Sequence, residues 1–326
     1  MREKIINIVL ACILGVLIAG IIVKEVQYRR AERCDWTFAV KAGKNQIIQC
    51  CYYTGWYGMR NNDDVIGRVL CDTDETLNGS NCSKENSLIP DTFYCKWFSY
   101  NENKFYEINV ALDRSKIKHF LKSSQYNRFL YLTAEFKEKG NVTIWLLSAV
   151  DTIELLSTRG QEVQEDWNEF KPDSSKISRN EYVNLVINKY QWNIVVNMKN
   201  KQFLNGVEVN TFNDEQYSFA KLDSAILYKM SGYGSLPLDS MAGFSLKSVP
   251  SEMWIWVSVD SSHDYSSWID FDDSKIADFF LRKADKTKKS TFVVNVQITG
   301  DDAQADIWLK QGQLEVKVDS VTINSY

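Results

Sequence analysis

The sequence predicts an α+β, β-rich fold in which two duplicated antiparallel-sheet modules, each with a packed helix, follow an N-terminal transmembrane helix. The duplication rests on self-similarity, because residues 97–120 and 256–279 align at a constant spacing of 159 with eight identities. The match resumes at a spacing of 163, where residues 144–146 and 307–309 both read Ile-Trp-Leu. Self-similarity at fixed spacing identifies an architectural unit before any single motif is interpreted.

The predicted transmembrane helix covers residues 5–23, which are uncharged and apolar apart from Asn7. At about 1.5 Å per residue this run roughly matches the ~30 Å hydrocarbon core of a bilayer. A cleaved signal has a shorter apolar run that ends in a small-residue cleavage site. The only candidate site, Ala19-Gly20, lies inside the run. We therefore expect an uncleaved anchor, with a cleaved signal as the alternative.

The cysteines predict disulfide bonds outside the cytoplasm. Six of the seven cysteines follow the apolar run within 62 residues: Cys34, Cys50, Cys51, Cys71, Cys82 and Cys95. An even, clustered set beside a secretion signal is typical of a disulfide framework, although the pairing stays open. A zinc site is disfavoured, because CxxC spacing is absent and the chain has two histidines. The lysines and arginines that flank the anchor instead favour an orientation with the large domain in the cytoplasm.

The domain organisation and the net charge of the chain limit the classes of partner that it can bind. We expect an anchor and juxtamembrane segment over residues 1–33, a first module with a cysteine-stapled loop over 34–188, and a diverged second module over 189–326. The net charge of the chain is −4, and residues 1–33 carry +3, which leaves −7 for the remainder. An acidic surface gives no electrostatic basis for binding nucleic acid. It is compatible with a basic protein surface.

Each predicted strand is a β-branched or aromatic run bounded by turn residues. The opening strands of the two copies are residues 36–40 and 192–196. Later strands are predicted over 46–56, 93–100 with 253–259, 105–112, 129–136 with 292–298, 142–147 with 305–309, and 152–156 with 313–318. Aligning Pro90 with Pro250 and Trp97 with Trp256 requires one additional residue in the first copy, between Pro90 and Trp97. We interpret this additional residue as a β-bulge.

Helix signals follow the strands. Asp113 and Asp272, or the serines two residues after them, are placed to cap a helix whose apolar residues, such as Ile276 and Phe279, share one face. Ser178-Arg179-Asn180-Glu181 is a capping-box pattern and predicts a short helix that only the first copy has.

Catalytic and metal-binding patterns are missing from the sequence. The two histidines, His119 and His263, occupy non-equivalent positions in the repeat. Ser262-His263-Asp264 holds three triad residue types, but triads are assembled across a fold and not from adjacent positions. Acidic pairs such as Asp272-Asp273 could hold a cation, yet such pairs are usually solvated turns. We expect no enzyme activity, no catalytic residues, no metal and no cofactor.

Tryptophan is the residue class with binding potential. Six of the ten tryptophans form three equivalent pairs in the repeat: Trp36 with Trp192, Trp97 with Trp256, and Trp145 with Trp308. Repetition at matched positions favours core anchors, because large aromatic side chains dominate burial. An exposed ring could instead stack on a sugar or contact a protein. The candidates for such binding are Trp56, Trp254 and Trp308.

The motifs Gly55-Trp56-Tyr57-Gly58, Gly160-Gln161-Glu162-Val163 and Lys189-Tyr190-Gln191-Trp192 resemble a family of bacterial envelope lipoproteins described only as a domain of unknown function. The resemblance spans roughly residues 34–200 and carries over no catalytic residue. Family members usually end their signal in a lipidated cysteine, whereas Ile21 follows the lipobox-like residues 17–20 here. This departure fits an uncleaved anchor in the bacterial inner membrane, with a lipid-anchored or cleaved periplasmic form as the alternative.

The resemblance also implies genes beside secreted-toxin loci. The sequence therefore predicts a non-enzymatic, membrane-anchored periplasmic binding protein, specifically an immunity protein against an envelope-acting toxin such as a lipase. Its expected contacts are a protein partner and the membrane through residues 5–23. The alternative is a glycan-binding or structural module of the cell envelope.

Overall fold

The structure is a computed structural model. It describes residues 10, 12–23, 33–56, 59–60, 66–71, 82–123, 129–147, 151–170, 175–198, 203–219, 234–237, 246–258, 264–299 and 302–325. The side chains of residues 50–86 lie outside this description.

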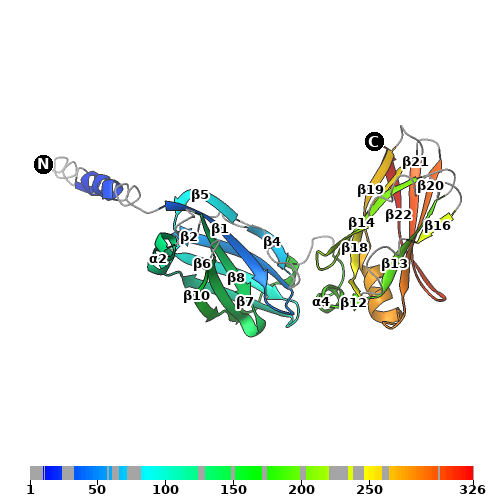
Figure 1. Cartoon of the computed structure of the whole chain (residues 1–326), viewed down its shortest axis with the longest axis horizontal. Helices are drawn as coiled ribbons and strands as arrows, with labels where there is room; N and C mark the ends of the chain where they lie inside the picture. The colour runs from blue at the N-terminus through cyan, green and yellow to red at the C-terminus, as the bar shows by residue number, and fades with distance from the viewer. Residues whose placement is uncertain are drawn as a thin grey trace.

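The first module is a pair of packed sheets (Figure 1). One sheet has the order β10-β9-β8-β1-β5, formed by β1 (Arg33–Ala42), β5 (Cys82–Leu88), β8 (Phe129–Phe136), β9 (Asn141–Leu147) and β10 (Thr152–Arg159). The other has the order β11-β7-β6-β2-β3, formed by β2 (Ile48–Trp56), β3 (Met59–Arg60), β6 (Thr92–Ser99), β7 (Lys104–Ala111) and β11 (Gln161–Val163), and β4 (Ile66–Cys71) also pairs with β2. Alternating side chains such as Phe38, Phe93 and Ile144 fill the space between the sheets.

The second module follows one continuous path of strands, β15-β14-β18-β19-β22-β21-β20-β13-β16. The bounds are β13 (Trp192–Met198), β14 (Phe203–Thr211), β15 (Gln216–Phe219), β16 (Gly234–Pro237), β18 (Pro250–Ser258), β19 (Asp264–Asp270), β20 (Ser290–Thr299), β21 (Asp302–Gln311) and β22 (Leu314–Ser325). The strands β12 (Lys189–Tyr190) and β17 (Lys247–Ser248) pair separately. Its core includes Ile194, Ile255 and Phe292, all of which are fully buried.

Both modules repeat one strand order, and both contain a parallel pair. β1 pairs with β8 in parallel, and β13 pairs with β20 in parallel. The expectation of purely antiparallel modules is therefore wrong. Parallel neighbours need a long crossover, and here most of the intervening module supplies it. The final strand also repeats: β11 returns to pair with β7, and the end of β22 returns to pair with β19.

A helix covers one end of each module. α2 (Arg114–Ser123) follows β7, while α6 (Asp273–Ala277) and the π-helical turn η3 (Asp278–Lys283) follow β19. The Asp113 carboxylate accepts the amides of Ser115 and Lys116, and the Asp272 carboxylate accepts the Ser274 amide, so both predicted caps are confirmed. The helices are anchored through Ile117 and Ile276, which are fully buried.

Two tryptophans lock the first strand of each module. The Trp36 indole donates to the Leu88 carbonyl at 3.1 Å, and the Trp192 indole donates to the Ser248 carbonyl at 2.9 Å. Both rings are buried, which confirms their predicted role as core anchors.

The strand registers show that Trp97 and Trp256 do not occupy equivalent positions in the two modules. Trp97 is buried and pairs with Tyr106, whereas the buried residue that pairs with Tyr265 is Val257. Trp256 precedes Val257, and a shift of one residue places a side chain on the opposite face of a sheet. β6 pairs with β2 and with β7 without a register shift, so the predicted bulge is wrong. The additional residue of the first copy lies in the connection after β6.

A helical segment joins the modules. α3 (Trp167–Phe170) and α4 (Arg179–Ile187) follow the first module in sequence. The Trp167 ring contacts Phe98 of the first module and Tyr182 of α4, and Tyr182 contacts Phe212 of the second. The core of the second module therefore extends through α4 to the first, and in Figure 1 α4 lies on the side of the second module that faces the first.

Two further expectations are corrected. Across the described residues, no helix is both long and apolar enough to span a membrane. This finding contradicts the transmembrane helix predicted over residues 5–23 and the inner-membrane location that rested on it.

The disulfide framework is also contradicted where the structure describes the thiols. No disulfide bond joins the thiols that the structure describes, which are those of Cys12, Cys34 and Cys95. Cys95 is buried in the apolar core, and burial raises the pKa of Cys34 to about 11, with the charge of Asp35 adding to the effect. Both thiols are thus packed as small apolar groups. The side chains of Cys50, Cys51, Cys71 and Cys82 lie outside the described residues.

Candidate functional site

Three tryptophans gather on the outer face of one sheet in the second module, and we call them the tryptophan platform: Trp254, Trp256 and Trp268. Trp254 and Trp256 alternate with core residues along β18, so both point away from the core. Trp268 of β19 lies directly across from Trp254. The side chain of Trp268 is 46% exposed, which is unusual for so large an apolar group.

Local packing holds the platform in place. The rings of Trp254 and Trp256 touch, and the centroids of Trp254 and Trp268 are 6.1 Å apart. Gly206 of β14 lies across from Trp256, and a Cβ atom at this glycine would approach the indole ring to 3.1 Å. The absence of a side chain at Gly206 therefore lets the Trp256 ring lie against the neighbouring strand.

Carboxylates border the platform. Glu208 lies across from Trp254 on β14, and Glu252 and Asp270 face each other on β18 and β19. The Glu252 carboxylate accepts hydrogen bonds from the Trp268 indole and from the Asn210 amide, both at 2.6 Å. Both donors are neutral. Among the described residues, no lysine or arginine forms an ion pair with Glu208, Glu252 or Asp270.

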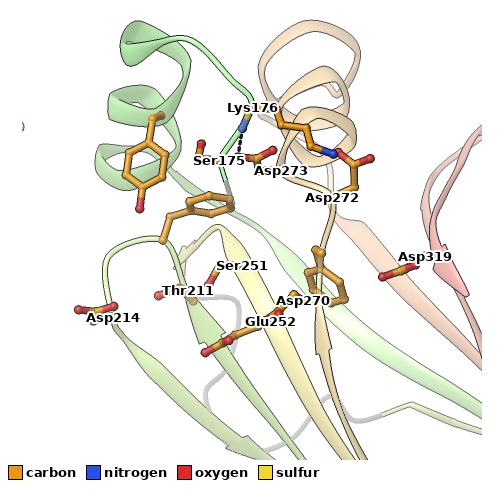
Figure 2. Close-up of a pocket in the computed structure, with 13 residues that line it drawn as sticks. Ser175, Lys176, Thr211, Asp214, Ser251, Glu252, Asp270, Asp272, Asp273 and Asp319 are labelled. Carbon is orange, nitrogen blue, oxygen red and sulfur yellow. Dashed lines mark hydrogen bonds between the residues drawn. The ribbon is translucent and has the colours of Figure 1, made fainter. Parts of the chain in front are cut away.

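A pocket of about 460 Å³ opens beside the platform, and we call it the acidic pocket (Figure 2). It is lined by the end of β14, the starts of β18 and α6, the end of β19 and the segment before α4. Six carboxylates border it: Asp214, Glu252, Asp270, Asp272, Asp273 and Asp319. Lys176 is the one basic residue of its lining, and Figure 2 shows this side chain extending toward Asp272. Glu252 and Asp270 belong to both the pocket and the border of the platform.

Electrostatics differ between the carboxylates of the pocket. Loss of water around the Asp214 carboxyl raises its pKa, and the negative charge of Glu252 raises it further. The hydroxyl of Ser274 lowers the pKa of Asp272, which is the helix cap. Asp273 accepts the Lys176 amide at 3.2 Å. In the described part of the chain, no group of three or more potential ligands is arranged to hold a metal ion. The pocket therefore presents negative charge without a metal-binding geometry.

The structure separates the three tryptophans predicted for binding. Trp254 belongs to the platform. Trp308 lies on β21 in the other half of the second module, where the Lys317 ammonium covers its ring at 5.8 Å. Trp56 ends β2 of the first module, and its side chain lies outside the described residues.

Sequence reasoning missed Trp256, Trp268 and Glu252 as parts of one site. The pattern Trp254-x-Trp256 on a strand was a usable signal, because residues two apart share a face. The contribution of Trp268 depends on the register between β18 and β19, which no local pattern specifies. Of the two histidines, His119 lies on α2, and His263 lies outside the described residues.

Comparison with known families matches residues 27–203 to the family described as "Protein of unknown function (DUF2931)". No curated protein matches the chain at a significant level. The matched segment begins before β1, covers the first module and α4, and ends at the start of β14. This is more than half of the sequence, so the chain belongs to the DUF2931 family of proteins of unknown function.

Proposed function

We propose that this protein is a non-catalytic binding protein that holds a protein partner on the tryptophan platform. The observation that carries the proposal is the cluster of three tryptophans on an outer sheet face, in which Trp254 lies against both Trp256 and Trp268 and Trp268 is nearly half exposed. Tryptophan is among the residues that contribute most binding energy at protein interfaces. Rings held by Gly206 and Glu252 lose little conformational freedom when a partner binds.

A narrower form of this proposal is immunity against a secreted toxin such as a lipase. Its support is the family resemblance together with the negative charge of the chain, which suits a basic partner. Immunity predicts that a cell lacking this protein becomes sensitive to one defined toxin and that the purified pair forms a stable complex. Loss of the protein without any change in sensitivity would argue against immunity but not against partner binding.

A second candidate is glycan binding by the same platform. The favouring observation is that Glu252, which accepts hydrogen bonds from the Trp268 indole and from the Asn210 amide, places polar groups next to a half-exposed ring. Sugars are held by stacking on such rings and by hydrogen bonds to neighbouring polar groups. Titration of tryptophan fluorescence with cell-wall fragments separates the candidates, because only the glycan candidate predicts a saturable shift.

The test of the main proposal is a comparison of W268A with W308A. Both substitutions remove a partly exposed indole from the second module, but only the first alters the platform. Loss of an interface tryptophan typically weakens binding by about 2 kcal/mol or more. A partner that co-purifies with wild-type protein and with W308A, but not with W268A, supports the proposal once the complex is rebuilt from purified components. Equal recovery with all three proteins would overturn it.

A further inference from the structure

We infer that the tryptophan platform recognises a cationic side chain, above all the guanidinium of an arginine, on an exposed segment of the partner. This inference rests on the proposed binding function and names the chemistry of its contact. The occupant is a polypeptide segment that brings a positive charge over the Trp268 ring and toward Glu252 and Asp270.

Elsewhere in the chain, a tryptophan, a carboxylate and a lysine lie together at two sites. On the outer face of β9, the Trp145 indole donates to Glu135, and the Lys137 ammonium lies 5.9 Å from the ring centroid and 3.3 Å from the same carboxylate. On β21, the Lys317 ammonium lies 5.8 Å from the Trp308 centroid and 2.8 Å from Asp306. In each case a tryptophan, a carboxylate and a lysine form one compact unit.

The platform has two of these three parts. The Trp268 indole donates to Glu252 at 2.6 Å, as the Trp145 indole donates to Glu135 at 3.1 Å. Among the described residues, however, no lysine or arginine lies over the rings of the platform or pairs with Glu252. The partner therefore supplies the cation that the chain supplies at Trp145 and Trp308.

Charge complementarity selects this occupant over others. A cation placed here gains from the ring quadrupole and from the carboxylates Glu208, Glu252 and Asp270 at once. A neutral sugar gains stacking and hydrogen bonds but no attraction between opposite charges, and an anionic ligand is repelled. Arginine suits the geometry better than lysine, because its planar group stacks on an indole while its edge donates to a carboxylate.

The experiment titrates full-length protein with capped tetra-arginine and tetra-citrulline peptides and follows the tryptophan indole N–H signals by NMR. Citrulline keeps the shape of arginine and removes its charge. We expect the arginine peptide to shift the Trp268 signal, identified by its loss in W268A, and to bind about tenfold more tightly than the citrulline peptide. E252Q and W268A should each weaken arginine binding about threefold or more, and W308A should leave it unchanged. Addition of salt should weaken arginine binding.

Several outcomes would overturn the inference. Equal binding of both peptides, no shift at Trp268 with the arginine peptide, or full binding by E252Q would each do so. W268F, which retains an aromatic ring, guards against misreading a folding defect and should recover part of the binding lost in W268A.

A neutral chito-oligosaccharide serves as the third probe. Binding of this sugar alone would refute the cationic contact and would point to a glycan as the ligand. A partner complex that depends on Trp268 but not on arginine would refute the inference and leave the proposed function intact.

Discussion

At the scale of single residues, buried indoles do more for this fold than their bulk implies. Trp192 fills the core of the second module, and its N–H satisfies the Ser248 carbonyl in a buried hydrogen bond of 2.9 Å. The Lys247 ammonium lies 4.9 Å from the ring centroid and donates to the Trp192 carbonyl at 3.0 Å. One side chain thereby ties β13 to β17 and compensates a buried positive charge.

W192F tests this role. The substitution leaves the Ser248 carbonyl without its donor and opens a small cavity beside Lys247, so we expect the free energy of unfolding to fall by about 2–4 kcal/mol. Urea denaturation measures the change. W308F is the matched control, because Trp308 is only partly buried and no described residue accepts a hydrogen bond from its indole. We expect a loss below about 1 kcal/mol. Similar losses in both variants would show that the hydrogen bond of Trp192 contributes little.

At the scale of elements, local chemistry predicted α4 and failed to predict the platform. The Ser-x-x-Glu pattern places the start of α4 correctly, because a capping box is satisfied within four residues: Ser178 accepts the Glu181 amide and Glu181 accepts the Ser178 amide. The faces of β18 depend instead on register, where a slip of one residue moves Trp256 from the core to the surface. Identity with Trp97 was therefore misleading. Trp254 could be chosen from the sequence, whereas its neighbour Trp268 required the pairing of β18 with β19.

S178A tests the capping box. Loss of the cap should lower the free energy of unfolding by about 1 kcal/mol. It should also reduce the acid sensitivity of the protein. The Ser178 hydroxyl, the Ser178 amide and Arg282 lower the pKa of Glu181 below 4.5, so the stability from Glu181 is present above that pH and is lost as the pH falls through the lowered pKa. Urea midpoints between neutral pH and pH 3 measure both effects. A wild-type acid response that S178A leaves unchanged would contradict this origin.

At the scale of the whole molecule, the strand pairing lay beyond the reach of the sequence. The individual strands were predicted from β-branched and aromatic runs. The structure has a strand at both members of every predicted pair of equivalent strands. The parallel contacts of β1 with β8 and of β13 with β20 join segments that are about 95 residues apart, and no short-range pattern reports such a contact. The transmembrane helix predicted over residues 5–23 rested on apolar composition alone, and among the described residues no helix is long and apolar enough to span a membrane.

α4 bridges the two modules. Arg179 lies 4.9 Å from the centroids of Phe98 and Phe105, and its side chain also donates to Asn103, so it binds α4 to the first module. On the opposite side, Glu181 pairs with Arg282 of η3 and binds α4 to the second module.

We expect R179A to lower hydrogen-exchange protection at the first-module contacts of α4, and R282A to do so at η3, because each removes a single side of the bridge. Arg179 is partly buried against two aromatic rings, whereas the Arg282 side chain is 59% exposed. We therefore expect R179A to have the larger effect, about 1–3 kcal/mol against less than about 1 kcal/mol for R282A. Exchange measured by mass spectrometry on the two variants decides the matter, and a uniform loss of protection across both modules in either variant would show that α4 is not a bridge with two separable sides.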